Sequence, residues 1–195
     1  MIKNTKLVWA LAAALSAAPA LAAGQSATIG YAQGKVSGGD TLRGVNAKYN
    51  YEFDNRWGVI GSLTYMKGSK SGLTDTTSIA PDILANGERS TKFFSLAAGP
   101  SYRLHDKVTA YGLLGVARTK ADVSADWMNH ESGTYVKRGT ESASTKRTGL
   151  SYGGGVQINP TQRYLVDLSY ENAPGTNGQQ NKRVNSFAIG LGCRF

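Results

Sequence analysis

The chain has 195 residues and a formal charge of +9, with 22 Lys and Arg residues against 13 Asp and Glu residues. With 41% hydrophobic residues, it has the composition neither of a polytopic helical membrane protein nor of a disordered chain. One cysteine and two histidines exclude a disulfide scaffold and a cysteine–histidine zinc site, and the excess of positive charge indicates an anionic partner.

The first element in chain order is a predicted signal peptide at residues 1–22. Lysines precede an apolar stretch at 7–15, and Ala20 and Ala22 occupy the positions that a signal peptidase reads. The rest, residues 23–195, is predicted to form a single domain. Losing the two lysines of the signal leaves 20 basic against 13 acidic residues, or +7. Because the protein is exported, we expect no nucleic-acid partner.

Alternation of apolar and polar residues predicts eight β-strands in the mature chain. Residues 45–53 show it well, with Val, Ala, Tyr, Tyr and Phe on one face and Asn, Lys, Asn and Glu on the other. The facing of the strand at 108–120 stays open, because Ala and Gly occur on both of its faces. The predicted strands are 27–35, 45–53, 57–65, 93–103, 108–120, 150–158, 164–171 and 187–195.

The connections alternate between short turns and long polar segments. Turns are predicted at 54–56, 104–107 and 159–163. Longer loops are predicted at 34–41, 67–91, 121–145 and 172–183. This pattern is typical of an all-β fold, an eight-stranded antiparallel up-and-down transmembrane β-barrel with four extracellular loops. The alternative is a soluble, lipocalin-like barrel, which the Gly- and Ser-rich polar face and the final Phe disfavour.

The polar strand faces place charged residues inside this barrel. They are Lys48, Glu52, Asp167, Glu171 and Arg194. Such a set can line a pore or a proton path, or it can form a packed network that satisfies its own charges. We favour the packed network, because the interior of an eight-stranded barrel is narrow enough for side chains to fill.

Basic residues gather at the long-loop ends of the strands, where they would face the outer leaflet. Lipopolysaccharide presents phosphates there, and Lys and Arg bind phosphate through charge and hydrogen bonds. We therefore expect a lipopolysaccharide-binding rim, although a merely solvated flank is the plainer alternative. Its candidate residues are Arg43, Lys67, Lys92, Arg118, Lys146, Arg147 and Arg183, of which Arg43, Arg147 and Arg183 are the leading candidates for phosphate contact.

The two longest predicted loops combine aromatic and charged residues. Trp127, Met128 and Tyr135 are candidates for a protein-binding patch, unless they pack loop against loop above the barrel. The sequence His130-Glu131-Ser132 is the one local arrangement that could support hydrolytic catalysis. Since it falls in the middle of a predicted polar loop, we expect no enzyme activity and no cofactor or metal.

The last strand carries an assembly signal of outer-membrane barrels. Phe187, Ile189 and Leu191 alternate with small or polar residues, and Phe195 ends the chain. The barrel-assembly machinery reads such strands, so we expect it as a partner and a Gram-negative outer membrane as the location.

Several segments together resemble the Ail/OmpX/PagC/Lom family of small outer-membrane proteins, from residue 27 to 195. They include Arg43-Gly44-Val45-Asn46-Ala47-Lys48-Tyr49, Ala98-Gly99-Pro100, Tyr111-Gly112-Leu113-Leu114-Gly115, Gly155-Val156-Gln157-Ile158-Asn159-Pro160, Ser169-Tyr170-Glu171 and Gly190-Leu191-Gly192. The segment at 37–46 looks closest to the phage-encoded Lom branch. Cys193 departs from the family, which usually has Tyr there.

The resemblance implies adhesion to host cells or matrix through the external loops, or serum resistance, with host-surface, matrix or complement-regulatory proteins as partners. The alternative function is a structural, lipopolysaccharide-interacting barrel that has no host protein ligand.

Overall fold

The computed structural model describes residues 24–37, 41–75, 83–131, 134–176 and 181–195, and within these ranges the side chains at 70–75, 83–88, 125–131, 134–141 and 181 lie outside the description. The predicted signal at 1–22 also lies outside it. Eight strands follow one another: β1 (Gln25–Val36), β2 (Thr41–Glu52), β3 (Trp57–Asp75), β4 (Ile83–His105), β5 (Val108–Glu131), β6 (Thr134–Ile158), β7 (Tyr164–Thr176) and β8 (Asn181–Arg194). The described ranges contain no helix that is long and apolar enough to cross a bilayer.

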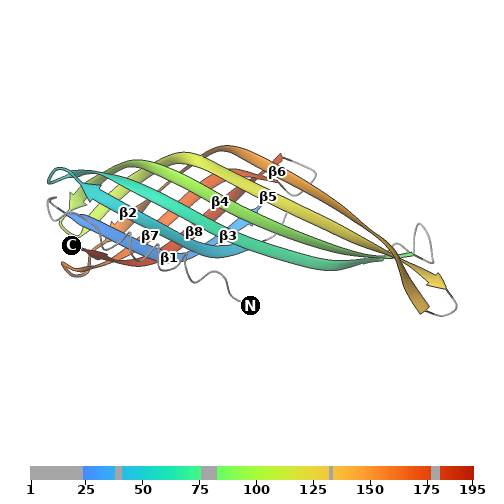
Figure 1. Ribbon diagram of the computed structural model, residues 1–195. Coiled ribbons are helices and arrows are strands. Elements are labelled where there is room, and N and C mark those ends of the chain that lie inside the picture. The colour runs from blue at the N-terminus through green and yellow to red at the C-terminus, as the bar shows by residue number, and fades with distance from the viewer. Residues whose placement is uncertain (1–23, 38–40, 76–82, 132–133, 177–180) are drawn as a thin grey trace, which may run out of the picture.

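The strands form one closed antiparallel barrel in the order β1 to β8 (Figure 1). Each strand pairs with the next along the chain, and β1 closes the barrel against β8, with Ala27 opposite Cys193. The backbones of Gln25 and Phe195 exchange two hydrogen bonds of 3.0 and 2.9 Å. The up-and-down topology is therefore confirmed, and β1 begins where β8 ends, at the barrel end with the short turns.

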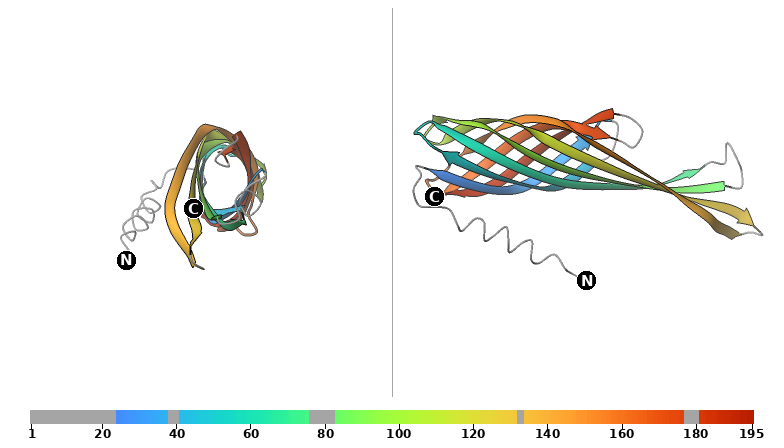
Figure 2. Two further views of the ribbon diagram at one scale, coloured as in Figure 1. Left: turned by 90° about the vertical axis from the view of Figure 1, so that its right-hand side faces the viewer. Right: turned by 45° about the horizontal axis from the view of Figure 1, so that its top comes forward.

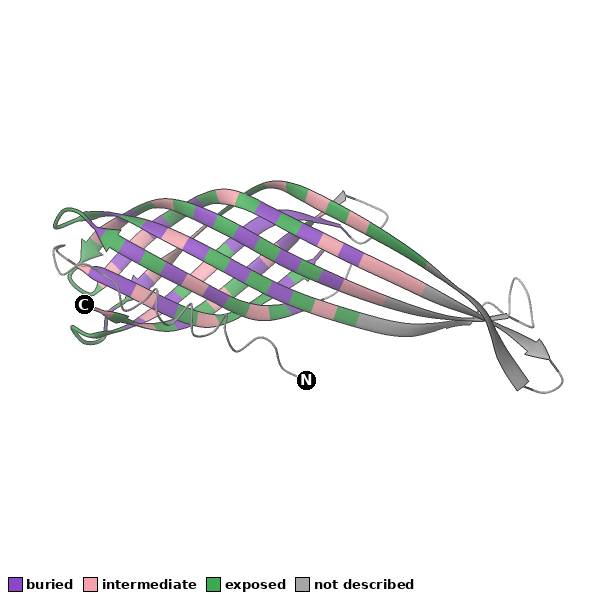
Figure 3. Ribbon diagram, in the orientation of Figure 1, coloured by how far each residue is buried: buried purple, intermediate pink, exposed green. Residues whose placement is uncertain are grey.

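The alternation of the sequence becomes an inner and an outer face of the barrel (Figure 3). Tyrosines, leucines and other large apolar side chains are exposed on the outside, while Asn, Ser, Thr and charged side chains are buried inside. The open question about residues 108–120 is settled, since Thr109 and Tyr111 are buried in the lumen and Leu114 and Val116 are exposed. Outward apolar residues suit a lipid environment.

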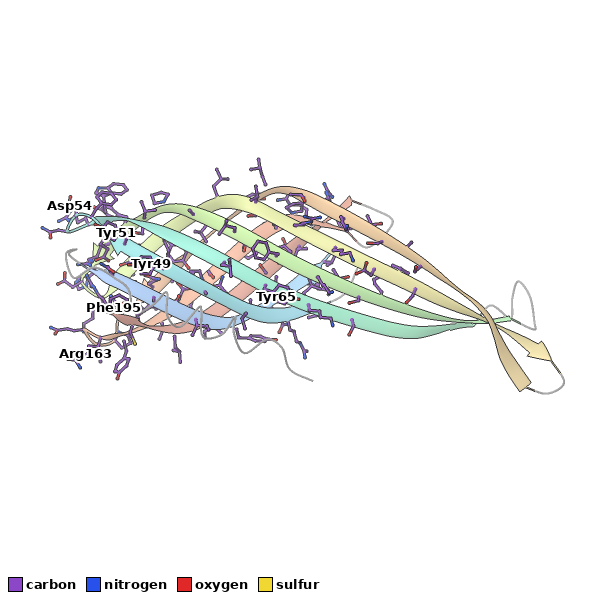
Figure 4. The ribbon with its side chains drawn as sticks, viewed as in Figure 1. Tyr49, Tyr51, Asp54, Tyr65, Arg163 and Phe195 are labelled. Atoms are coloured by element: carbon purple, nitrogen blue, oxygen red, sulfur yellow. The ribbon has the colours of Figure 1, made fainter. Side chains whose placement is uncertain are left out.

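Aromatic residues mark both borders of the apolar band. Figure 4 shows Tyr49, Tyr51 and Phe195 toward the end with the short turns and Tyr65 farther along the barrel. Trp57 and Tyr65 are both exposed, eight positions apart on β3. At about 3.3 Å per residue and a tilt of about 40°, this distance along a strand spans roughly 20 Å across a membrane.

The two longest predicted loops turn out to be mostly β-strand, which corrects the sequence analysis. β3 continues to Asp75, β4 begins at Ile83, β5 continues to Glu131 and β6 begins at Thr134. These four strands extend beyond the barrel as a projecting sheet (Figures 1 and 2). The prediction ended the strands where apolar alternation stops. Outside lipid, however, backbone pairing persists without that alternation, because water solvates both faces of the sheet.

Two different layers fill the barrel. A cluster of buried apolar side chains lies at the outer mouth, formed by Ala32, Val36, Leu42, Met66, Phe93, Ala117, Ala173 and Val184. Toward the end with the short turns, the lumen is mostly polar and also holds a second apolar cluster of Ile60, Ala97, Tyr111 and Leu113. The end of β7 contributes to the closure, since all residues from Glu171 to Thr176 are buried.

Candidate functional site

The centre of the lumen is built around Lys48 of β2. Its Nζ lies 2.5 Å from Asp167 Oδ1 on β7, and the two side chains are 1% and 0% exposed. The same ammonium donates to Asn46 Oδ1 at 2.5 Å and to Ser169 Oγ at 2.9 Å. Tyr111 OH donates to the other carboxylate oxygen of Asp167 at 2.8 Å. The buried charge is thus paired and hydrogen-bonded on several sides.

A second carboxylate, Glu171, extends the network toward the mouth. Ser95 and Thr64 donate hydroxyl hydrogen bonds to it, the latter at 3.3 Å. Thr64 in turn accepts a hydrogen bond of 2.8 Å from Asn46 Nδ2. The chain of contacts from Glu171 through Thr64 and Asn46 reaches Lys48, so the two carboxylates belong to one connected network.

At the end with the short turns, Glu52 holds two arginines. Arg194 of β8 lies 2.7 Å from Glu52 Oε2, and Arg103 of β4 contacts the same oxygen. The three side chains tie together strands from different parts of the chain. All five lumen residues named from the sequence face this interior, and Arg103, which was not named, joins them. Its alternation within 93–103 was blurred, so the sequence offered only a weak signal.

A row of five cations crosses the outer face at the root of the projecting sheet. In the strand register, Arg43 lies opposite Lys67, Lys67 opposite Lys92, Lys92 opposite Lys120, and Lys120 opposite Lys146. We call these five residues the cation row. Like charges on directly opposed positions repel each other, so the row favours bound counter-anions.

The rows around the cation row have a different character. Directly below it, toward the apolar band, Tyr65 lies opposite Phe94, and Phe94 opposite Arg118. Above it, Asp122 forms an exposed ion pair of 2.8 Å with Lys120. Hydrogen bonds from Lys120 and Ser144 lower the pKa of Asp122 below its usual value. From the lipid tails outward to the phosphates, aromatic side chains are expected first and cationic side chains next.

The three leading rim candidates lie at different positions in the structure. Arg147 turns away from the outer face, is half-buried, and donates from Nη1 to the carbonyls of Gly175 at 3.2 Å and Lys182 at 3.3 Å. On β6 the odd-numbered positions face inward, so Arg147 lies at the mouth of the barrel, and its contact with phosphate stays a prediction. Arg183 is exposed, but its guanidinium stacks 5.2 Å from the Tyr152 ring. Only Arg43 of the three lies in the cation row.

The candidate loop patch lies on strands of the projecting sheet. Trp127 and Met128 are in β5, opposite Ala85 and Leu84 of β4, and Tyr135 of β6 pairs with His130. The side chains of these residues lie outside the description. His130 and Glu131 are therefore on a strand, not in a loop as expected, and Ser132 lies outside the described residues. No cluster of three or more metal-binding side chains occurs in the described part of the chain.

The C-terminal strand presents its apolar residues to the outside. Phe187, Ile189, Leu191 and Cys193 are exposed on the outer face of β8, and Phe195, which follows the strand, is exposed as well. A role of this strand in barrel assembly stays a prediction.

Comparisons with known proteins agree with this architecture. The model of the enterobacterial Ail/Lom protein family matches residues 2–195. The virulence membrane protein PagC of Salmonella typhimurium is 36% identical over 86% of this chain and 85% of its own length. The outer membrane protein Lom of phage lambda is 31% identical over 94% of both chains. Because PagC is 36% identical, sequence identity does not favour the Lom branch over the others.

Solved structures point the same way. The crystal structure of Ail, the attachment invasion locus protein of Yersinia pestis, matches with a TM-score of 0.64 and 33% identity, covering 90% of this chain and 100% of Ail. A second crystal structure holds Ail in complex with the heparin analogue sucrose octasulfate, with a TM-score of 0.63. The family is one of outer-membrane barrel proteins. The chain belongs to the Ail/Lom family and is an eight-stranded β-barrel protein of the outer membrane.

Proposed function

We propose that this protein attaches the bacterium to host surfaces through the projecting sheet of β3–β6, without enzymatic activity, and that its cation row holds the base of that sheet among lipopolysaccharide phosphates. The observation that carries the proposal is the continuation of four paired strands beyond the barrel, since such an extension contributes nothing to spanning the membrane.

The projecting sheet offers strand edges to a partner. The described pairing of β2 with β3 stops at Arg43 and Lys67, although β3 continues to Asp75. The pairing of β6 with β7 stops at Tyr152 and Asn172, although β6 begins at Thr134. Backbone groups along such an edge can pair with an extended segment of another protein.

The charge of the β6 edge selects an acidic partner. Between its start and the barrel, β6 carries Lys137, Arg138 and Lys146 against a single acidic residue, Glu141. Acidic protein segments and sulfated host glycans both complement this charge. The complex of Ail with a sulfated heparin analogue supports the same chemistry for this chain. Attachment to matrix or complement-regulatory proteins would use the same edge, and the latter would give serum resistance.

The direct test is adhesion of a non-adherent Gram-negative strain that displays the protein to epithelial cells. One variant replaces residues 70–89 and 123–143 by short Gly/Ser linkers, which preserves the pairs Ser69 with Ser90 and Asp122 with Ser144. We expect the strain that displays the intact protein to adhere to the cells, and the strain that displays the trimmed barrel not to adhere. Equal adhesion of both, with both shown at the surface, would contradict the proposal.

The matched control leaves the projecting sheet intact and replaces Lys67, Lys92 and Lys120 by Gln. If adhesion depends on the sheet, this variant keeps adhesion but releases lipopolysaccharide more readily in salt. If neither the intact nor the trimmed protein adheres and only the Gln variant loses lipopolysaccharide, the second candidate function holds. That function is a structural, lipopolysaccharide-bound barrel, and the observation that favours it is the unbroken cation row.

A further inference from the structure

The network at the centre of the lumen contains one more carboxylate than it has cations. Asp167 pairs with Lys48, whereas no salt bridge reaches Glu171 among the described side chains. Within that part of the chain, the Glu171 carboxylate accepts hydrogen bonds from the hydroxyl groups of Thr64 and Ser95 alone, and the residue is 7% exposed. A buried charge is costly unless an opposite charge compensates it. The centre of the lumen therefore carries one uncompensated negative charge.

Other cations that face the interior of the barrel are engaged elsewhere. Arg103 and Arg194 share Glu52 at the end with the short turns. Arg147, at the mouth, donates to two backbone carbonyls of β7 and β8. These side chains therefore do not supply the positive charge that Glu171 lacks.

A small cavity of about 10 Å³ lies beside Glu171 in the lumen. Its volume is close to that of one water molecule or one small ion. Apart from apolar residues, its lining consists of oxygen-bearing side chains from four strands, namely Asn46 of β2, Ser62 and Thr64 of β3, Ser169 and Glu171 of β7, and Ser186 of β8.

The hydroxyl oxygens around this cavity keep lone pairs that no other group uses. Thr64 donates its proton to the Glu171 carboxylate at 3.3 Å, and Ser186 donates its proton to the Glu171 carbonyl at 3.2 Å. Ser62 accepts one hydrogen bond of 3.1 Å from Asn46 Nδ2, and a hydroxyl oxygen has two lone pairs. A water molecule offers only two protons to such a set and leaves the negative charge in place. A cation interacts with all of these oxygens at once and also compensates the charge.

We propose that the cavity binds one monovalent cation of the size of sodium. The Glu171 carboxylate is its counter-charge, and the hydroxyl oxygens of Ser62, Thr64 and Ser186 are further ligands. A single positive charge makes the network neutral. A calcium ion would exceed that charge and takes six to eight oxygen ligands, and a magnesium ion keeps several of its waters, for which the cavity has no room. The bound cation links β3 to β7 and β8 across the lumen. This inference does not rest on the proposed function, since it concerns the lumen and not the projecting sheet.

The test measures urea unfolding of the full barrel in vesicles of phosphatidylcholine, with sodium chloride replaced stepwise by tetramethylammonium chloride at constant ionic strength. Tetramethylammonium is too large for the cavity. A ligand that binds only the folded protein stabilises it by mass action, so the unfolding equilibrium constant should fall about tenfold for each tenfold rise in sodium above its dissociation constant. An unfolding midpoint that does not depend on sodium would show a water molecule or a proton at Glu171 and overturn the inference.

Three variants assign the sodium dependence to the lumen. Glu171→Gln removes the counter-charge and should abolish the dependence. Ser62→Ala with Ser186→Ala keeps the charge but removes two ligands, and should weaken sodium binding about tenfold, so this pair decides the question if the Gln variant does not fold. Asp122→Asn, which changes an exposed carboxylate beside the cation row, should leave the dependence unchanged. The same dependence in all variants would place the ion outside the lumen and overturn the inference.

Anomalous diffraction from crystals of the refolded barrel, grown in rubidium chloride, locates the ion directly. We expect a peak in contact with the oxygens of Glu171 and Thr64, and no such peak in the Glu171→Gln variant. Crystals of the unchanged protein without a peak in the lumen would contradict the proposal.

Discussion

The barrel and the projecting sheet are made of the same strands, yet their side chains follow different rules. On β5, residues 109–119 alternate between buried and exposed positions, whereas Asp122, Val123 and Ser124 are all half-exposed. The backbone ladder runs through both parts, with a register shift between Trp127 and Met128 in the projecting sheet. Pairing therefore needs only the backbone, while alternation is required where a packed lumen and lipid lie on opposite sides.

We expect the largest loss of stability from substitutions in the lumen, where paired charges are fully buried. Lys48→Met leaves Asp167 buried with no cation at its side, which typically costs about 3–5 kcal/mol. The double variant Lys48→Met with Asp167→Leu should recover most of the loss, because it leaves no unpaired charge. Urea unfolding in lipid vesicles, followed by Trp fluorescence, measures both. Equal destabilisation by single and double variants would show that packing volume, and not charge, dominates.

An arginine introduced in the barrel part or in the projecting part of β5, on the same face, tests directly whether the two parts follow different rules. Leu114→Arg puts a cation on the lipid-facing surface and should destabilise the barrel by about 2–4 kcal/mol near the bilayer centre. Ser124→Arg, on the same face of β5 beyond the cation row, should change stability by less than about 0.5 kcal/mol. The same unfolding assay compares the two. Similar effects at both positions would place residue 124 inside the membrane.

Substitutions of the neighbouring residues Arg147 and Lys146 on β6 should differ less in their effect on stability. Arg147→Gln removes the hydrogen bonds to the carbonyls of Gly175 and Lys182 and should cost about 1–2 kcal/mol, since this group is half-buried. Lys146→Gln, which removes an outward charge, should be nearly neutral in vesicles of zwitterionic lipid. Proteolysis of the β7–β8 connection should accelerate only in the Arg147 variant. Equal sensitivity of both variants would contradict the assignment of Arg147 to the mouth.

The smallest effect concerns Asp122 and pH. Hydrogen bonds from Lys120 and Ser144 lower the pKa of this carboxyl, so its contribution to stability is present at neutral pH and is lost as the pH falls through the lowered pKa. Because the pair is exposed, Asp122→Asn should barely move the unfolding midpoint, and high salt should erase the difference. An NMR titration of the Asp122 carboxyl in intact protein and in Lys120→Gln checks the shift.

Much of the barrel could be predicted from the sequence. All eight strands, the closed up-and-down order and the inward facing of Lys48, Asp167 and Glu171 followed from alternation. The strand ends beyond residues 65 and 120 did not, because polar residues on both faces remove the signal while backbone pairing continues. The inward position of Arg147 was not predicted because alternation near 145–150 is weak, so that its side could not be read from the neighbouring residues.

By itself, the sequence determined the number and faces of the strands, because a period of two is local information that each strand carries separately. The cation row and the shared network of Lys48 with Asp167 were decided only by the tertiary structure. Each of them joins residues that lie far apart in the chain, and the register that brings them opposite one another is set by the closure of the whole barrel.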